Sequence, residues 1–572
     1  MGRTVGARMP ARSWAGCWCV VWLGWAASAA AALPARPPGY ACATAHPLAT
    51  QACMQVMAEG GNAFDAAVAA SAALAVVEPT GSGLGGGGFW LLHRASDGFE
   101  VFVDGRETAP GRAHRDMYLD AEGKPDERRS RDGVLAAAIP GEPAALAWIA
   151  QRYGSKPLAE LLAPAIGYAR DGFTVDGKLA AAIAAQRDRL SWAARKVFMP
   201  EGEPLPAGAL LRQPDLAWTL TQIAERGHAG FYEGAVAQRL VQAVERTGGL
   251  WTAEDLRRYR VVERTPLVTW FRAHRIVTAP PPSAGGVALA QVFQQLEVLG
   301  WRDDGSVEAH HLLIEALRRA YRDRAAYLGD PDFVPVPLMR LSGRSHAVAL
   351  ASSIDRARAT PSAALPPAPL FTEGTHTTHL SVLDAQGNRV AATLSINLPF
   401  GSGFMAPGTG VLLNDEMDDF AASPGAPNAY GLVGAQANAI APYKRPLSSM
   451  TPSFVEGPRG LLVIGTPGGS RIITMVIQGI LAWIAGLDAD SIVALPRLHH
   501  QYLPDVVQLE ADALDPAQRM ALAALGHRLQ PSDGRWGNLQ IVSWEPARDV
   551  LQAASDPRGV GHGAVAITMP AP

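Results

Sequence analysis

Two adjacent threonines between two histidines are the first residues in this chain whose types suggest chemistry. The stretch EGTHTTHLSV places Thr377 and Thr378 between His376 and His379, where a polar segment becomes an alternating strand. Threonine hydroxyls can serve turn chemistry, or they can act as nucleophiles when a base lies nearby. The remaining residues have to decide between a turn and a reaction centre.

The pattern after Thr377 predicts a hairpin with one polar face. Period-two alternation places Leu380 and Val382 on an apolar face together with Thr378, and residues 384–388 supply the turn. The opposite face comprises Thr377, His379, Ser381, Thr393, Ser395 and Asn397. A solvent-facing sheet surface usually carries charged side chains, whereas these two strands contain only Arg389. The hydroxyl-rich face therefore favours the interior of a site.

Three later stretches carry groups that bind charge. LLNDEMDDF, residues 412–420, holds four carboxylates, which suit a hydrated turn or a pair that receives an ammonium group. A calcium loop is disfavoured because its glycine and terminal glutamate are missing. KRPLSSMTPS offers the hydroxyls of Ser448 and Ser449 to an anion. Gly468 and Gly469 precede an apolar helix, and consecutive glycine N–H groups in that position suit an oxyanion.

Two stretches near residue 100 allow a structural or a functional interpretation. The glycine-rich segment 81–88 lacks the lysine of a phosphate-binding loop and precedes a strand, so close backbone packing beside a site is favoured over nucleotide binding. Arg106 follows a predicted strand that ends at Asp104. A lone arginine in that position usually makes a surface ion pair.

The composition and the first residues indicate an exported protein. The chain has 572 residues and a net charge of -3, which gives no reason to expect nucleic acid or an anionic membrane surface as a partner. Three arginines precede an apolar run that ends in small residues, which predicts a cleaved signal peptide over residues 1–32 rather than an uncleaved anchor. We expect a periplasmic or secreted protein without a membrane segment in its mature form.

The cysteines and histidines give little sign of a metal. Cys42 and Cys53 remain after signal removal, and either a disulfide or two buried thiols fits an exported protein. The pairs His310-His311 and His499-His500 are adjacent in sequence, so their side chains diverge, and we expect no metal site.

The helical patterns predict a scaffold around the hairpin. Residues 42–79 are predicted to form a short strand and two helices, the second capped by Asn62. Residues 156–173 have the apolar spacing of a core-facing helix, and residues 310–331 repeat it with basic residues facing outward. Residues 345–376 predict a helix and then an exposed linker that ends at Thr377.

Taken together, these motifs resemble the γ-glutamyltransferases of the N-terminal nucleophile hydrolase superfamily. The resemblance runs from about Ala43 to Pro557. It rests on nine motifs in order: GGNAFDAAVA, SGLGGGGF, DGRETAP, PPPSAGG, TTHLSV, LLNDEMDDF, RPLSSMTP, GTPGGSR and ASDPR. It implies an α+β fold with four αββα layers, built from two autocleaved subunits, and no cofactor. The implied cut between His376 and Thr377 gives a large subunit, 33–376, and a small catalytic subunit, 377–572.

The resemblance also implies a role for each site residue. Thr377 attacks the γ-carbonyl of glutathione or a related γ-glutamyl amide, and the acyl group passes to water or to the amine of an amino acid or dipeptide. The new α-amine, with a pKa of about 8, is the base. The implied assignments are Thr378 and Ser395 for orienting the nucleophile, Gly468 and Gly469 for the oxyanion, Arg106, Ser448 and Ser449 for the substrate α-carboxylate, Asn397, Glu416 and Asp419 for its α-ammonium group, and Tyr430 for closing a lid at residues 424–434.

The sequence departs from the family pattern at three positions. Ser395 stands where threonine is more usual, which keeps the hydroxyl, and Leu398 and Pro399 replace polar residues at the expected mouth of the site. Other functions stay open: a cephalosporin acylase or a poly-γ-glutamate hydrolase from the same superfamily, or a catalytically silent γ-glutamyl-binding protein. The charged set and paired serines argue against the acylase, the lid argues against the polymer, and the retained Thr377 argues against the silent protein.

Overall fold

The structure of this protein is a computed structural model, and it describes residues 36–368, 376–421 and 436–568. None of the helices in these ranges is both long and apolar enough to cross a membrane. The expected signal peptide and Tyr430 of the expected lid lie outside the described residues.

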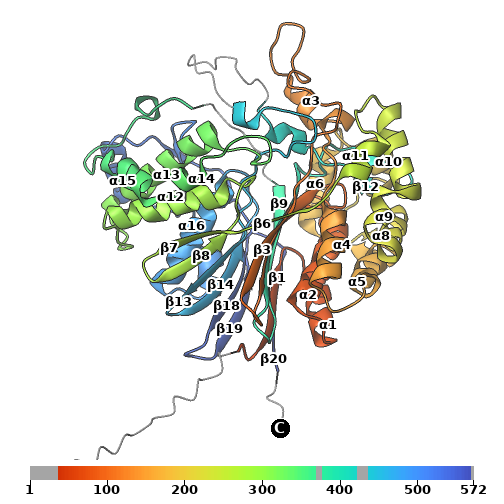
Figure 1. Cartoon of the computed structure of the whole chain (residues 1–572), viewed down its shortest axis with the longest axis horizontal. Helices are drawn as coiled ribbons and strands as arrows, with labels where there is room; N and C mark the ends of the chain where they lie inside the picture. The colour runs from red at the N-terminus through yellow and green to blue at the C-terminus, as the bar shows by residue number, and fades with distance from the viewer. Residues whose placement is uncertain (1–35, 369–375, 422–435, 569–572) are drawn as a thin grey trace, which may run out of the picture. The chain divides into compact units, whose positions relative to one another are not determined.

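Two antiparallel sheets lie at the centre of the fold (Figure 1). The first has the order β20 (His562–Ile567), β1 (Gly39–Thr44), β9 (His376–Leu383), β10 (Arg389–Asn397), β2 (Gly87–Arg94), β3 (Phe99–Gly105) and β6 (Val262–Arg264). The second has the order β19 (Val550–Ser555), β18 (Gln540–Glu545), β14 (Gly460–Gly465), β13 (Ser453–Gly457), β8 (His274–Thr278) and β7 (Leu267–Phe271). Because β9 contacts both β14 and β18, the sheets pack face to face.

Helices cover the outer face of each sheet (Figure 1). The first sheet is contacted by α1 (Pro47–Ala58), α2 (Ala63–Val77) and α4 (Glu142–Arg152), with α5 (Leu158–Asp171) and α8 (Pro214–Arg226) packed outside them. The second is contacted by α12 (Gly285–Val298), α16 (Arg471–Ala485) and α17 (Ala489–Ala494), with α13 (Val307–Tyr327) and α15 (Arg344–Ser352) against α12. These four layers confirm the predicted αββα fold class.

The β9–β10 hairpin has the predicted alternation of apolar and polar side chains, but its polar face has a different role from the predicted one. Leu380 and Val382 pack into the core under the helices, as their apolar face requires. On the polar face, His379 Nδ1 lies 2.8 Å from Thr393 Oγ1, and Ser381 Oγ donates to the Gln540 carbonyl at 3.0 Å. Most of that face therefore serves hydrogen bonds within and between the two sheets. A site interior was predicted for all of it, but only its end at Thr377 lies among the candidate site residues.

Helix α2 is the buried scaffold that its alanines predict. The Asn62 side chain accepts hydrogen bonds from the N–H groups of Phe64 and Asp65, and the Asp65 carboxylate accepts from the Asn62 N–H. This reciprocal capping box satisfies N–H groups that a helix start leaves unpaired. All residues of α2 are buried, so its small side chains allow the helix to lie directly on β9 and β10.

The prediction of outward-facing basic residues on α13 is wrong. Arg318, Arg319 and Arg324 are each no more than 2% exposed. Arg318 and Arg319 pair with Glu315 of the same helix, and Arg318 also pairs with Asp505. Buried charges require such partners, and Asp505 is remote in sequence, so helical spacing alone could not reveal it.

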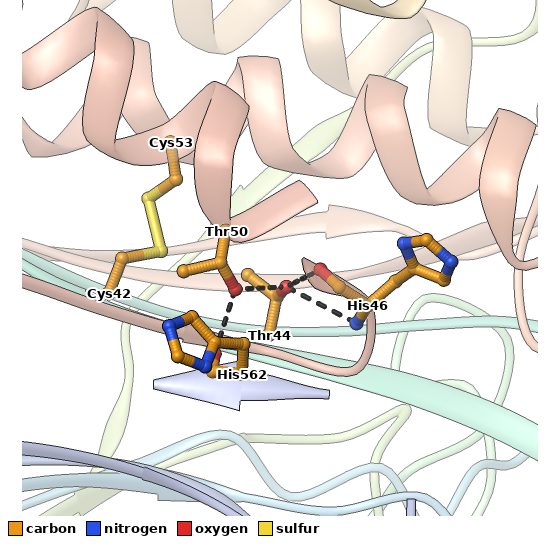
Figure 2. Close-up of a disulfide and its surroundings, with 6 residues drawn as sticks. All are labelled: Cys42, Thr44, His46, Thr50, Cys53 and His562. Atoms are coloured by element: carbon orange, nitrogen blue, oxygen red, sulfur yellow. Dashed lines mark hydrogen bonds between the residues drawn. A yellow bond between two sulfur atoms is a disulfide. The ribbon is translucent and has the colours of Figure 1, made fainter. Parts of the chain in front are cut away.

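Cys42 and Cys53 form a disulfide between β1 and α1, which decides between the two alternatives left open by the sequence (Figure 2). Beside it, the hydroxyls of Thr44 and Thr50 lie 2.8 Å apart, and Thr50 Oγ1 donates to the His562 carbonyl at 2.7 Å. This neighbourhood ties β1 and α1 to β20, the last strand of the chain.

Replacing both cysteines with alanine is expected to destabilise the protein by about 2–4 kcal/mol, because the bridge restricts the unfolded chain. Thermal unfolding followed by circular dichroism should show a lower Tm for the double variant than for the wild type. Adding a reductant should lower the wild-type Tm and leave that of the variant unchanged. Equal midpoints for wild type and variant would contradict the structural role of the bridge.

Candidate active site

The start of β9 is paired on one side only. Pairing with β1 ends at Leu380, whereas pairing with β10 continues through Thr377 opposite Ser395 to His376 opposite Asn397. The strand begins at His376, one residue before the predicted start, because His376 joins this ladder. The register shifts between Ser395 and Asn397, and such bulges recur beside active sites, where they redirect side chains.

The bulge aims the Ser395 hydroxyl at the peptide bond before Thr377. Ser395 Oγ donates to the His376 carbonyl at 3.3 Å and accepts from the Asn397 N–H at 2.8 Å. Asn397 has φ 74, in the left-handed region that asparagine tolerates better than most residues, and its amide donates to the Asp415 carbonyl at 3.0 Å. Thr377 itself is 7% exposed. The His376–Thr377 peptide thus lies beside one oriented hydroxyl donor.

Two glycines form a turn just beyond β14. The last residue of this strand, Gly465, lies against the imidazole of His379, two residues from Thr377. Gly468 and Gly469 follow with φ 137 and φ 56, values that glycine adopts without strain, and α16 begins at Arg471. Within the described part of the chain, neither glycine N–H donates a hydrogen bond. Two consecutive glycines thus precede an apolar helix, and among the described residues their N–H groups have no hydrogen-bond acceptor.

The charged residues form a buried cluster around Arg106. Its guanidinium donates to Glu416 at 2.6 Å and to Asp419 at 2.5 Å, and all three side chains are at most 7% exposed. Burial alone would lower the pKa of Arg106, but the carboxylates of Glu416, Asp419 and Glu107 outweigh it and the net pKa is raised. The expected surface ion pair at Arg106 and the expected hydrated turn at 412–420 are both wrong. Arg106, Glu416 and Asp419 pair with one another in the interior, where all three side chains are shielded from solvent.

The paired serines lie next to this cluster. Arg106 Nε donates to the Pro446 carbonyl at 3.3 Å and Nη2 donates to the Leu447 carbonyl at 3.2 Å. Ser448 follows directly, and its backbone pairs with the predicted loop 279–286. Ser449 Oγ accepts from Arg324 Nη2 at 3.0 Å. The structure thus brings Arg106, Ser448 and Ser449 together, and the 279–286 loop forms the wall behind them.

Several contacts that hold the site could not be predicted from the sequence. Asn438 donates to the Asp419 carbonyl at 2.6 Å and accepts from the Leu447 N–H at 3.0 Å, joining the acidic and serine segments. Asp415 accepts from the Leu398 N–H at 3.0 Å. Arg189 donates to the carbonyls of Pro399 and Gly401, at 3.3 and 2.8 Å, and so holds the segment that departs from the family pattern. These are contacts to backbone groups, which leave no signal in sequence spacing.

The adjacent histidines diverge as predicted, but His311 meets a different histidine. His499 Nδ1 lies 2.9 Å from Thr474 Oγ1, whereas His500 Nε2 lies 3.3 Å from Asp505 Oδ1. His311 Nδ1 lies 2.8 Å from His527 Nε2, and one nitrogen of each ring lies with a Glu315 oxygen in a group whose atoms are all within 4.8 Å of one another. Glu315 is already paired with two arginines, which disfavours a cation there. We therefore interpret this cluster as a buried polar network.

The four-layer fold, with a buried threonine at the start of a central strand, defines an N-terminal nucleophile hydrolase. The model of the γ-glutamyltranspeptidase family matches residues 49–566, and the chain belongs to that family. Its relatives include the glutathione hydrolase proenzyme of Escherichia coli, strain K12, 42% identical over 93% of this chain and 95% of the relative.

Two solved structures extend the comparison. The cephalosporin acylase from Bacillus halodurans superposes with a TM-score of 0.81 at 29% identity and covers 93% of this chain and 96% of its own. The γ-glutamyltranspeptidase of Helicobacter pylori gives a TM-score of 0.54 at 39% identity, covering 56% of this chain and 93% of the matched one. The protein is therefore an enzyme of a family whose members are made as proenzymes.

Proposed function

We propose that this enzyme is a γ-glutamyltransferase and glutathione hydrolase that cuts itself between His376 and Thr377. The observation that carries the proposal is the Ser395 hydroxyl, which donates to the His376 carbonyl beside the buried Thr377. Attack of Thr377 Oγ on that carbonyl carbon forms an ester while the His376–Thr377 C–N bond breaks, and the released nitrogen takes the hydroxyl proton to become the α-amine of Thr377. Water then hydrolyses the ester, which releases the His376 carboxylate and restores the Thr377 hydroxyl. Removal of residues 1–32 and this cut leave subunits 33–376 and 377–572, in the periplasm or outside the cell.

In the processed enzyme, Thr377 is the nucleophile and its own α-amine is the base. The amine takes the hydroxyl proton as Oγ attacks the γ-carbonyl of the substrate, and it returns the proton to the leaving amine. The N–H groups of Gly468 and Gly469, which donate to no acceptor in the part of the chain that the structure describes, stabilise the oxyanion. Thr378 and Ser395 orient the nucleophile. Water or the amine of an amino acid or dipeptide then breaks the acyl-enzyme ester.

The charged cluster selects a γ-glutamyl group because it offers both signs of charge. Arg106, Ser448 and Ser449 bind the α-carboxylate, whereas Asn397, Glu416 and Asp419 bind the α-ammonium group. Glu416 Oε1 supports this assignment, because it is buried and accepts no hydrogen bond from the described residues. Tyr430 is assigned to the lid from sequence alone.

A second candidate function is cephalosporin acylase, favoured by the likeness to the Bacillus halodurans structure. Glutaryl-p-nitroanilide serves as the test compound for this alternative, because it has the same carbon chain as the γ-glutamyl compound but no α-ammonium group. It therefore leaves Glu416 and Asp419 without their proposed ligand. Comparing γ-glutamyl-p-nitroanilide with glutaryl-p-nitroanilide separates the candidates. The proposed function predicts a preference for the γ-glutamyl compound of at least about 100-fold in kcat/KM, since buried polar groups left unpaired are costly. An equal or inverse preference would favour the acylase.

Replacing Ser395 with alanine is expected to slow self-cleavage by about 10²- to 10³-fold, the usual effect of removing one oxyanion donor. The Ser395→Thr variant is the matched control, because it keeps the hydroxyl and adds one methyl group. The fraction of cut chain should be followed on denaturing gels after purification of the uncut precursor. Wild-type cleavage rates in Ser395→Ala would refute the role of this hydrogen bond.

A further inference from the structure

Glu78 brings a carboxyl group toward the start of β9 from a side that the proposed mechanism does not use. It is the residue after α2, and α2 contacts β9. A Cβ atom built on Gly81 would lie only 3.1 Å from the Glu78 carboxyl carbon, so the carboxyl group lies against the glycine-rich loop. Its Oε2 atom is enclosed and accepts no hydrogen bond from the described residues.

Thr378 is the polar neighbour of this carboxyl group. Its side chain is fully buried, and Oγ1 makes no hydrogen bond of ordinary geometry within the described ranges. The hydroxyl is nevertheless close enough to lower the pKa of Glu78 against the larger effect of burial. The enclosed Oε2 atom of Glu78 and the Thr378 hydroxyl therefore lie side by side, at the second residue after the proposed cut, and neither has another hydrogen-bond partner among the described residues. Because such groups are costly when unpaired, each is the natural hydrogen-bond partner of the other.

Glu78 also changes its charge in the neutral pH range. Burial raises its pKa to about 7, while Thr378 and Lys178 oppose the rise and Asp176 adds to it. Lys178 and Asp176 lie at the start of α6 (Gly177–Gln186) and are the charged groups that act on this carboxyl. The carboxyl can donate to the Thr378 hydroxyl when protonated and accept from it when ionised.

We propose that Glu78 is a positioning residue whose carboxyl group holds the Thr378 hydroxyl and thereby fixes the backbone of Thr377. This inference rests on the proposed function, since it assigns Thr377 as cut site and nucleophile. Because Thr377 and Thr378 are adjacent residues, an ionised carboxyl that holds the Thr378 hydroxyl lies within about 10 Å of the Thr377 α-amine. Its negative charge favours the protonated amine and so raises the pKa of the amine. Because only the unprotonated amine can act as the base, kcat/KM then falls on the acid side at a higher pH with Glu78 than without it.

The Glu78→Gln variant separates the two effects, because glutamine keeps the shape and the hydrogen bond and loses the charge. We expect self-cleavage within about twofold of the wild type and an acid limb of kcat/KM, measured with γ-glutamyl-p-nitroanilide, shifted down by about 0.5 pH unit. Glu78→Ala should slow self-cleavage about tenfold, the usual scale for a lost buried hydrogen bond. Combining it with Thr378→Val should slow cleavage no further than the slower single variant.

Glu142→Gln is the matched control, because this carboxyl group is also buried at the glycine-rich loop, where the Gly83 N–H acts on it, and its oxygens accept no hydrogen bond of ordinary geometry from the described residues. It should leave the acid limb in place. The inference would be overturned if the pH profile of kcat/KM for Glu78→Gln superimposed on that of an active wild type. It would also be overturned if the losses in cleavage rate of Glu78→Ala and Thr378→Val added up in the double variant. If the wild type neither cuts itself nor hydrolyses the anilide, the proposed function itself fails. Should Glu78→Ala not fold, the pH profile of Glu78→Gln still decides.

Discussion

The Arg106→Ala variant is expected to lose about 10²- to 10³-fold in kcat/KM for γ-glutamyl-p-nitroanilide. Glu416 and Asp419 face the Arg106 guanidinium at 2.6 and 2.5 Å in a buried site. Removing one partner of such a cluster costs about 3–5 kcal/mol, because the remaining charges are left uncompensated. The substrate α-carboxylate also loses its proposed cation. Initial rates across substrate concentrations, with the cut enzyme, give this ratio directly.

Two controls separate binding from a general loss of structure. Arg106→Lys keeps a positive charge without the planar fork that reaches two carboxylates, so it should retain more activity than alanine. 4-Aminobutyryl-p-nitroanilide lacks the α-carboxylate, so the wild type and Arg106→Ala should differ far less with it. An equal loss on both substrates would mean that Arg106 only supports the fold.

Replacing Thr377 with alanine is expected to abolish both self-cleavage and hydrolysis. The variant lacks the hydroxyl that attacks in both reactions, and removal of a nucleophile from a catalytic unit typically costs several orders of magnitude in kcat. Thr377→Ser is the matched control, because it keeps the hydroxyl and loses only a methyl group. It should be cut and should remain active at a reduced rate.

Thr378→Ala serves as the neighbouring control for this prediction. It removes a hydroxyl one residue away, so it should slow the reactions without abolishing them. Hydrolysis by uncut Thr377→Ala at more than about one thousandth of the wild-type rate would contradict the assigned nucleophile.

Local patterns predicted the elements that carry the nucleophile. The β9–β10 hairpin follows from a period-two pattern, and the Asn62 cap follows from a polar side chain before an apolar helix. Gly468 and Gly469 precede α16 in a conformation that favours glycine. Each depends on residues close together in sequence. The resemblance to the family supplied the roles and the αββα fold class, which no single pattern determines.

The burial of charged side chains whose partners are remote in the sequence could not be predicted. The partners of Arg106 lie about three hundred residues later in the chain, so the sequence alone suggested a surface ion pair. Arg318 is buried because Asp505 reaches it from the other subunit of the proposed pair, and helical spacing placed it outward. No role for Glu78 could be predicted, because its neighbour Thr378 is three hundred residues away in the sequence. Burial of a charged side chain depends on such partners.

Intact mass measurement of the purified wild-type protein, combined with N-terminal sequencing of the smaller chain, tests the central claim most directly. Self-cleavage between His376 and Thr377 predicts two chains after denaturation, the smaller with the mass of residues 377–572 and a sequence that begins at Thr377, Thr378, His379. A single uncut chain in an active preparation, or a smaller chain that begins at any other residue, would contradict it.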